Sequence, residues 1–527
     1  MKNSANAGVR PAAQRRENSG KLSRIAVHHS RNQDRLAIIS TLAVRRIPYF
    51  VGSLVILYIF MHHAWFGLAA GFTHDDLMNM HRGLEHSYSE LVADCLLFWR
   101  PTPAYRPLVI LTYKLYLDVF GLNLVGLNAF RYLILCLNLW LAYALGRRLS
   151  GSREAGALAA LLMCYHPAFS TLYCSSGTLF DIFCFLFFFA ALLAYARIRA
   201  SGRFPTTIEG AGIYLLFILA LDSKEMAVTL PLLLALYELI YHGADLMRSA
   251  RDLLRASVLP LVTGAGAASY AFGRVLSKDG IAYSGDYHAV YTAGEYVKQA
   301  GHYFAELLNR PDTALAPAIT VVLLVGMLAV AAILRSRALL FSSLLWMVGI
   351  LPVAFIPWRG LNAVYIPLAG IATYGAVLLE TMRRRLACAL DKRLPELFGV
   401  KSSAALLFFV VAAALLVTPT SLIYSYESMR MHEYEPIGSF MRQLSALHPQ
   451  IDKTAMVLVV EDPFGEFNWA SLFIIHLVYR EPGIVVHRLA SMDPKPTPEE
   501  IAHYDYRLAF DGKLVRDVPT EEAIRGR

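Results

Sequence analysis

The sequence contains few charged residues for its length. Only 17% of its 527 residues are Asp, Glu, Lys or Arg, whereas an ordinary soluble domain has about 25%. Hydrophobic residues make up 56% of the chain, and the mean hydropathy is +0.45. This composition excludes an ordinary water-soluble enzyme and predicts an α-helical polytopic membrane protein.

Cysteine is also scarce, and its spacing excludes a disulfide framework or a cysteine metal site. Most of the six cysteines lie inside apolar runs, without paired spacing. They are Cys95, Cys136, Cys164, Cys174, Cys184 and Cys388. The chain also lacks an internal repeat and an Asn-x-Ser/Thr glycosylation acceptor, which is compatible with a bacterial inner membrane.

Acidic residues are almost absent from the polar, basic segment 1–46. No small-residue cleavage site follows the first apolar run, so we do not expect a signal peptide that is removed. The basic flank predicts a cytoplasmic N-terminus. The net charge of +9 comes largely from short basic clusters between apolar segments, which indicates topology signals and no nucleic-acid partner.

Apolar segments long enough to cross a membrane alternate with basic connections, which predicts about eleven transmembrane helices and a C-terminus outside. Residues 107–120 contain Lys114 and Asp118, and we expect them to form a helix at the outer interface. The predicted spans are 48–70, 125–145, 154–172, 178–196, 208–222, 226–242, 256–275, 314–334, 338–357, 362–382 and 403–420.

The pattern changes after the transmembrane domain, which we place at 47–422. In residues 423–527, segments 454–460 and 483–486 are typical of short strands, and 468–479 is typical of a helix. Asp511-Gly512 has the signature of a hairpin turn. We expect a small extracytoplasmic α/β domain here.

A polar stretch from Gly71 to Pro107 separates the first apolar segment from the next, and the loop 71–106 is our candidate catalytic loop. Adjacent carboxylates at a membrane surface, here Asp75 and Asp76, are costly unless they handle a proton or bind a cation. The simpler alternative is a solvated pair that caps the following helix. The same loop is dense in titratable groups: His74, His81, Glu85 and His86.

Basic residues at the expected outer ends of spans are candidates for binding a phosphate. They are Arg106, Lys224 and Arg359; the alternative is that each reaches to the interface without a ligand. Asp181, inside the fourth span, must face a partner or a cavity. His166, next to Pro167, has the features of a helix-end residue.

Short motifs in this order resemble the GT-C superfamily of glycosyltransferases that use polyprenyl-phosphate sugars. The resemblance is strongest to protein O-mannosyltransferases and to the transmembrane O-mannosyltransferases that carry tetratricopeptide repeats. The motifs are Asp75-Asp76, Tyr105-Arg106-Pro107-Leu108, Asn128, Tyr165-His166-Pro167, Ser223-Lys224-Glu225, Leu230-Pro231-Leu232-Leu233 and Val364-Tyr365-Ile366-Pro367-Leu368-Ala369-Gly370.

The resemblance implies that Asp75 or Asp76 acts as the general base and that Arg106 and Lys224 lie near the phosphate of an undecaprenyl- or dolichyl-phosphate sugar. Asn362 and Ala363 stand where relatives commonly have a Glu-Arg pair, so Arg359 is a candidate substitute. Six further residues are candidate supporting residues of the site: His74, Tyr105, His166, Asp181, Glu225 and Tyr365.

These observations favour an inverting transferase that moves a sugar from a polyprenyl-phosphate donor to a protein or glycolipid acceptor at the outer face. The lipid environment would supply the donor, and a divalent cation at Asp75 and Asp76 is possible. Two alternatives stay open: a ligase or polymerase that uses a lipid diphosphate, and a transporter. A transporter would normally place its ionisable residues near the membrane midplane, whereas here they gather at the outer ends of the spans.

Overall fold

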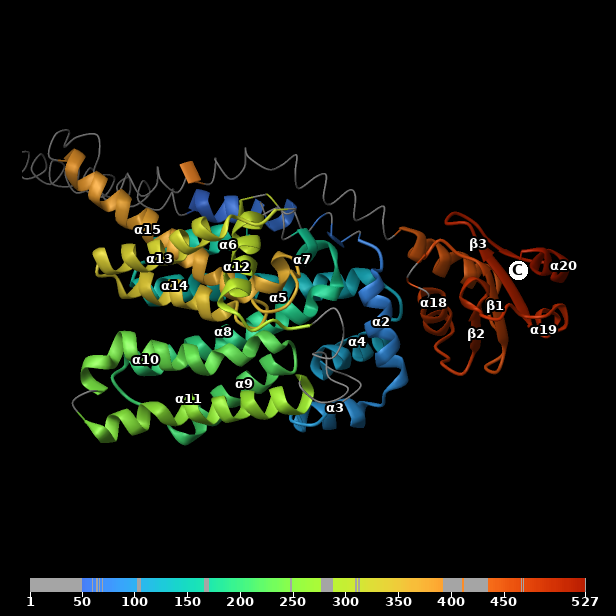
Figure 1. Cartoon of the computed structure of the whole chain (residues 1–527), viewed down its shortest axis with the longest axis horizontal. Helices are drawn as coiled ribbons and strands as arrows, with labels where there is room; N and C mark the ends of the chain where they lie inside the picture. Colours follow the sequence, from blue (N-terminus) through green and yellow to red (C-terminus); the bar gives the residue numbers. More distant parts are fainter. Residues whose placement is uncertain are drawn as a thin grey trace, which may run out of the picture. The chain divides into compact units, whose positions relative to one another are not determined.

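The computed structural model of the chain is shown in Figure 1. The chain divides into two compact units: Met1–Val55 with Arg383–Ala413, and Ile56–Met382 with Ala414–Arg527. All contacts discussed below lie within the second unit. The described residues are 50–58, 60–62, 65, 67–68, 70–101, 106–164, 170–246, 249–275, 288–308, 310, 313–391, 410–411, 435–465, 467 and 469–526.

Helices account for nearly all regular structure before residue 392. The polar stretch after the first apolar segment folds into two short helices, and the following elements correspond to the predicted spans and their connections. In chain order they are α2 (His74–Glu85), α3 (Tyr88–Leu96), α4 (Pro107–Phe120), α5 (Leu124–Ser150), α6 (Arg153–Cys164), α7 (Ser170–Cys174), η2 (Ser176–Thr178), α8 (Leu179–Ala200), α9 (Thr207–Leu221), η3 (Glu225–Thr229), α10 (Leu230–Leu246), α11 (Ala250–Tyr270), η4 (Ala271–Val275), α12 (Ala293–Leu307), α13 (Pro317–Ile333), α14 (Arg337–Gly349), η7 (Leu361–Val364) and α15 (Tyr365–Asp391).

Four helical segments in the described part of the chain are long and apolar enough to cross a membrane. They are Leu124–Ser150, Leu179–Ala200, Glu225–Leu246 and Asn362–Leu386. Shorter apolar helices include Thr207–Leu221, Pro317–Ile333 and Arg337–Gly349. A multi-pass helical architecture is therefore confirmed, whereas the count of eleven spans stays a prediction. Most of the predicted span 403–420 falls outside the described residues.

Two connections between the predicted spans contain helices of their own. The helix predicted over 107–120 is confirmed as α4, which begins with a proline at its first turn, where the missing N–H costs no hydrogen bond. The long connection 276–313 contains α12, which we did not predict. Thr292 caps α12 by accepting a hydrogen bond from the backbone N–H of Glu295.

Small residues allow the long helices to approach closely. A Cβ atom at Gly156 of α6 would lie 2.7 Å from the carbonyl oxygen of Tyr143 in α5. A Cβ atom at Gly370 of α15 would lie 2.7 Å from the carbonyl oxygen of Ser342 in α14. Close packing of this kind is how helices associate in lipid, where burial of apolar surface provides little drive.

The C-terminal residues form a small α/β module, as predicted. Its four-stranded sheet has the order β2-β1-β3-β4, in which β1 pairs in parallel with β2 and β3, and β4 is antiparallel to β3. At the predicted hairpin, the backbone N–H groups of Lys513 and Leu514 donate to Asp511 Oδ1, both at 2.8 Å. The elements are β1 (Met456–Glu461), α18 (Ala470–Tyr479), β2 (Val485–Arg488), η8 (Leu489–Ser491), α19 (Pro498–Ala502), β3 (Tyr506–Phe510), β4 (Val515–Asp517) and α20 (Thr520–Arg525).

Candidate functional site

Asp76, the second of the two adjacent aspartates, anchors the start of α2. Its Oδ2 accepts hydrogen bonds from the backbone N–H and the hydroxyl of Thr73, at 2.9 and 2.8 Å. Thr73 Oγ1 in turn accepts from the backbone N–H of Asp76, which completes a capping box. The other carboxylate oxygen accepts from the Tyr113 hydroxyl at 2.9 Å. The fully buried Asp76 therefore has a structural role.

Asp75 has different surroundings from its neighbour. Its side chain is exposed to solvent, yet the protein around it is dense enough to desolvate the carboxylate in part. This desolvation raises the pKa of Asp75 above its usual value, and the charge of Asp76 acts in the same direction, whereas Arg106 and Lys224 oppose the shift. Asp75 thus lies within the electrostatic reach of two of the three predicted phosphate-binding residues, Arg106 and Lys224.

A glycine makes room for Asp75. A Cβ atom placed on Gly177, in η2, would lie 2.6 Å from Asp75 Cβ and 2.9 Å from its Oδ2. Such distances are shorter than nonbonded contacts allow, so η2 and α2 can approach in this way only with glycine at position 177. This close approach was not predicted; its only signal in the sequence is a glycine directly before the fourth apolar run.

Arg106 forms a bidentate ion pair. Its Nη2 lies 2.9 and 2.8 Å from the two carboxylate oxygens of Glu225, and its Nε lies 3.2 Å from Oε2. Both side chains are less than one-fifth exposed, and the guanidinium lies over the ring of Phe180, 4.9 Å from its centroid. The pair joins the start of α4 to the start of η3 and fixes the plane of the guanidinium.

Lys224 pairs with Asp181. Its Nζ lies 2.5 Å from Asp181 Oδ1, and both side chains are about nine-tenths buried. The partner that Asp181 requires inside an apolar segment is therefore the lysine that precedes η3. Asp181 lies in the first turn of α8, so this pair and the Arg106–Glu225 pair meet near one end of the helical bundle.

The remaining predicted site residues divide into three groups. Tyr365 is buried against Phe185, with ring centroids 4.5 Å apart, and belongs to the same end of the bundle as Asp181. Arg359 lies beside Tyr303 of α12 and is not among the principal charges that act on Asp75 or Asp181. Tyr105 and His166 lie outside the described residues.

His74 contacts the C-terminal module. Its ring stacks on Phe467, with centroids 3.9 Å apart. One face of α2 packs on α18 in the same way: His81 stacks on Phe473 at 4.0 Å, and His81 Nε2 lies 2.9 Å from His476 Nδ1. The C-terminal module therefore packs directly on the helix that carries Asp75.

A further buried ion pair next to the site was not predicted. Arg274 Nη1 lies 2.8 Å from Asp222 Oδ1, and both side chains are fully buried. The same guanidinium donates to the backbone carbonyls of Asp94 and Arg100, which lie in the polar stretch after α2. The sequence did contain a signal for this ion pair. Arg274 is a basic residue at the outer end of the predicted span 256–275, where the topology does not require a positive charge.

The geometry offers little to a metal ion. Among the described residues, no group of three or more His, Cys, Asp or Glu side chains comes together in a way that could hold one. Both carboxylate oxygens of Asp76 already accept hydrogen bonds from Thr73 and Tyr113. Asp75 and Asp76 therefore do not offer two carboxylates that are free to bind a metal ion.

The two ion pairs and Asp75 form the charged cluster: Asp75, Arg106, Asp181, Lys224 and Glu225. Most of this cluster lies within a segment that matches a known family. Residues 101–266 match the family described as dolichyl-phosphate-mannose-protein mannosyltransferase. This segment, which is less than half of the chain, is similar to that family. It contains Arg106, Asp181, Lys224 and Glu225, whereas Asp75 precedes it.

Two other comparisons stand beside this family match. No curated protein matches the chain. Among solved structures, the crystal structure of ArnT from Cupriavidus metallidurans bound to undecaprenyl phosphate is similar, with 14% sequence identity and a TM-score of 0.40. That likeness covers 84% of this chain and 86% of ArnT. At this score the agreement does not by itself define the site.

Proposed function

We propose that this protein is a GT-C glycosyltransferase that transfers a sugar from a polyprenyl-phosphate donor to an acceptor hydroxyl, with Asp75 as the general base. The observation that carries the proposal is the solvent-exposed Asp75 carboxylate within electrostatic reach of two ion-paired cations, Arg106 and Lys224. The description of the matched family, which names a polyprenol-phosphate sugar and a protein acceptor, supports the same reaction class.

Asp75 is better suited than Asp76 to take the acceptor proton. The carboxylate of Asp75 is exposed, whereas that of Asp76 is buried and bonded to Thr73 and Tyr113. The raised pKa of Asp75 makes its carboxylate a stronger base than an ordinary aspartate. As the acceptor oxygen bonds to the anomeric carbon, its proton passes to Asp75 and the bond from that carbon to the phosphate oxygen breaks.

The two basic residues would act on the leaving group. When the sugar departs, the phosphodiester becomes a phosphomonoester and its negative charge increases. A preorganised guanidinium and ammonium in a partly desolvated site stabilise that charge most strongly in the transition state. Glu225 and Asp181 hold Arg106 and Lys224 in position, so neither side chain has to be ordered when the donor binds.

The C-terminal module, which packs on α2, is a candidate for shaping acceptor access. Because α18 contacts the helix that carries Asp75, the module and the catalytic loop lie on the same side of the membrane. We assign both to the outer face, as the basic connections predict. A protein or glycolipid acceptor would then approach Asp75 beside this module.

Replacing each aspartate with asparagine tests the assignment. In protein reconstituted with radiolabelled polyprenyl-phosphate hexoses and membrane extract as the source of acceptor, we expect Asp75→Asn to lower the transfer rate by about 10²–10⁴-fold without changing thermal stability. We expect Asp76→Asn to lower the unfolding temperature, because it weakens the capping box and the bond to Tyr113.

The matched control is Asp118→Asn. It removes a partly exposed carboxylate near the C-terminal end of α4, away from Arg106. It should leave the transfer rate unchanged and the stability nearly so, because an exposed ion pair such as that with Lys114 contributes about 0–1 kcal/mol. Full transfer by Asp75→Asn protein would contradict the proposal, as would solute uptake into proteoliposomes without any sugar transfer.

A further inference from the structure

A cavity of about 790 Å³ opens between α5 and α8, at the end of these helices that is opposite to the charged cluster. Asp181 lies in the first turn of α8 and Arg197 in the last. With a helical rise of 1.5 Å per residue, the two positions are about 24 Å apart along the axis. The cavity is therefore separate from the candidate catalytic site, near the opposite membrane surface.

Two kinds of side chain line the cavity. Arg147 and Arg148 come from the last turn of α5, and Arg197 comes from the last turn of α8. The rest of the wall is mostly apolar or aromatic and includes Trp140, Leu141 and Leu193. Trp140 is 62% exposed, on a helix long enough to cross a membrane, where an exposed indole would face lipid or the membrane interface.

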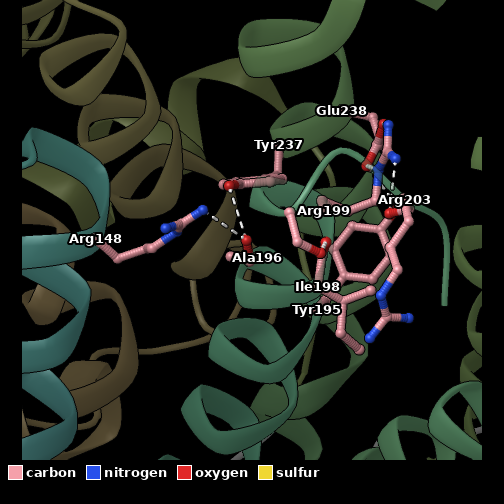
Figure 2. Close-up of polar contacts among 9 residues, drawn as sticks. Arg148, Tyr195, Ala196, Ile198, Arg199, Arg203, Tyr237 and Glu238 are labelled. Carbon is pink, nitrogen blue, oxygen red and sulfur yellow. Dashed lines mark hydrogen bonds and ion pairs between the residues drawn. The ribbon is translucent and has the colours of Figure 1, made fainter.

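The three arginines have no carboxylate partner among the described residues, whereas the nearby Arg199 does. Figure 2 shows Arg199 paired with Glu238, at 2.6 and 3.1 Å, and Arg148 extended toward the carbonyl oxygen of Ala196, at 2.9 Å. Within the described part of the chain, no carboxylate forms an ion pair with Arg147, Arg148 or Arg197. The buried Nε of Arg148 has no hydrogen-bond partner there either. The cavity therefore carries three positive charges beside apolar walls, and no carboxylate of the described residues forms an ion pair with them.

We propose that this cavity binds an anionic phospholipid of the surrounding membrane, with its phosphate among the three guanidiniums and its acyl chain along the apolar wall. Guanidinium groups match a phosphate in charge and hydrogen-bonding geometry, and basic pockets between transmembrane helices suit lipid head groups. The bilayer delivers such a ligand directly to a cavity at this position. This site is independent of the sugar-transfer reaction proposed above.

Topology alone does not account for the arrangement. Basic residues at cytoplasmic helix ends need only be present to orient a protein, and exposed residues such as Arg251 and Arg255 at the start of α11 meet that need. Arg147, Arg148 and Arg197 differ because they line one cavity. Their effect should therefore be specific for a ligand, which a topology signal is not.

Native mass spectrometry of the full chain in neutral detergent can test this proposal. We expect the protein to retain phosphatidylglycerol but not phosphatidylcholine, and Arg147→Gln/Arg197→Gln protein to bind phosphatidylglycerol at least about tenfold more weakly. Both positions are exposed, so the substitutions should not disturb folding. Arg251→Gln/Arg255→Gln protein removes the same charge away from the cavity and should bind like the unmodified chain.

Three outcomes would overturn the proposal. The cavity variant and the control could lose binding equally, which would indicate a general charge effect. The cavity variant could bind as tightly as the unmodified chain. Inorganic phosphate could displace phosphatidylglycerol at equal concentration, which would indicate a site for free phosphate. Since the readout is lipid binding, none of these results depends on whether the protein transfers a sugar.

Discussion

Asp75 and Asp76 are adjacent in α2 but differ in burial and in hydrogen bonding. Thr73 is the N-cap of α2 and the buried Asp76 completes its capping box, whereas Asp75 has a solvent-exposed side chain. This difference follows from helix geometry. Only the residue at the third position of the first turn can return its side chain to the cap, and the residue before it points elsewhere.

At the residue scale, we expect Gly177→Ala to impair transfer. The added Cβ would overlap Asp75, so either the carboxylate or η2 must move. A displacement of about 1 Å in a catalytic group costs about 10²-fold in rate. Steady-state kinetics should show a lower kcat with little change in unfolding temperature.

The control for this substitution is Gly210→Ala in α9, where a Cβ atom would meet nothing within 4 Å. This change should leave kcat unaltered and slightly favour the helix. Unaltered kcat in Gly177→Ala protein would show that the position of Asp75 does not limit the reaction.

At the scale of elements, the contact between α2 and α18 contains a histidine pair with a defined proton arrangement. His476 Nε2 lies 2.8 Å from the carbonyl oxygen of Ile484 and must donate to it. In neutral His476, Nδ1 therefore accepts the hydrogen bond from His81 Nε2. A proton added to His476 would place two donors opposite each other.

We expect this contact to weaken below neutral pH. Burial lowers the pKa of His81 to about 4, and the proximity of His476 adds to the shift; burial also lowers the pKa of His476, against the opposing charges of Glu85 and Glu481. A histidine whose pKa is lower in the packed state binds fewer protons there. Packing is therefore fully stable above the ordinary value of 6.5 and loses stability as the pH falls from 6.5 toward 4.

Hydrogen exchange of α18 at pH 7.5 and pH 5 measures this effect. His476→Asn keeps an acceptor for His81 but cannot take up a proton, so its exchange should depend less on pH than that of the unmodified chain. His503→Asn, on the exposed end of α19, should retain the full dependence. Equal dependence in all three proteins would exclude the histidine pair as its cause.

At the scale of the whole molecule, the proposed topology places the C-terminal module and the α8–α9 turn on opposite sides of the membrane. We expect a membrane-impermeant maleimide added to intact cells to label Lys453→Cys, whose native side chain is 84% exposed, and not Arg203→Cys, whose native side chain is 50% exposed. Both variants need a background in which Cys95, Cys136 and Cys388 are serine. Labelling of both from outside would contradict this topology.

Local patterns were sufficient to predict much of the fold. Most of the predicted apolar segments are helical where the structure describes them, 107–120 forms α4, and the Asp511-Gly512 turn joins two strands of the C-terminal sheet. Each prediction depends on neighbouring residues, whose periodicity and turn chemistry act within a few positions of the chain. The helix α12 was missed because its connection was rich in polar and tyrosine residues instead of continuously apolar.

The sequence by itself determined that this protein is a multi-pass membrane protein and which charged residues stand at its helix ends. Only the tertiary structure decided how those charges combine, because the partners lie far apart along the chain: Lys224 and Asp181 are 43 positions apart, and Arg106 and Glu225 are 119 apart. A buried charge must find an opposite charge or a hydrogen bond. The packed helices determine which partner it meets.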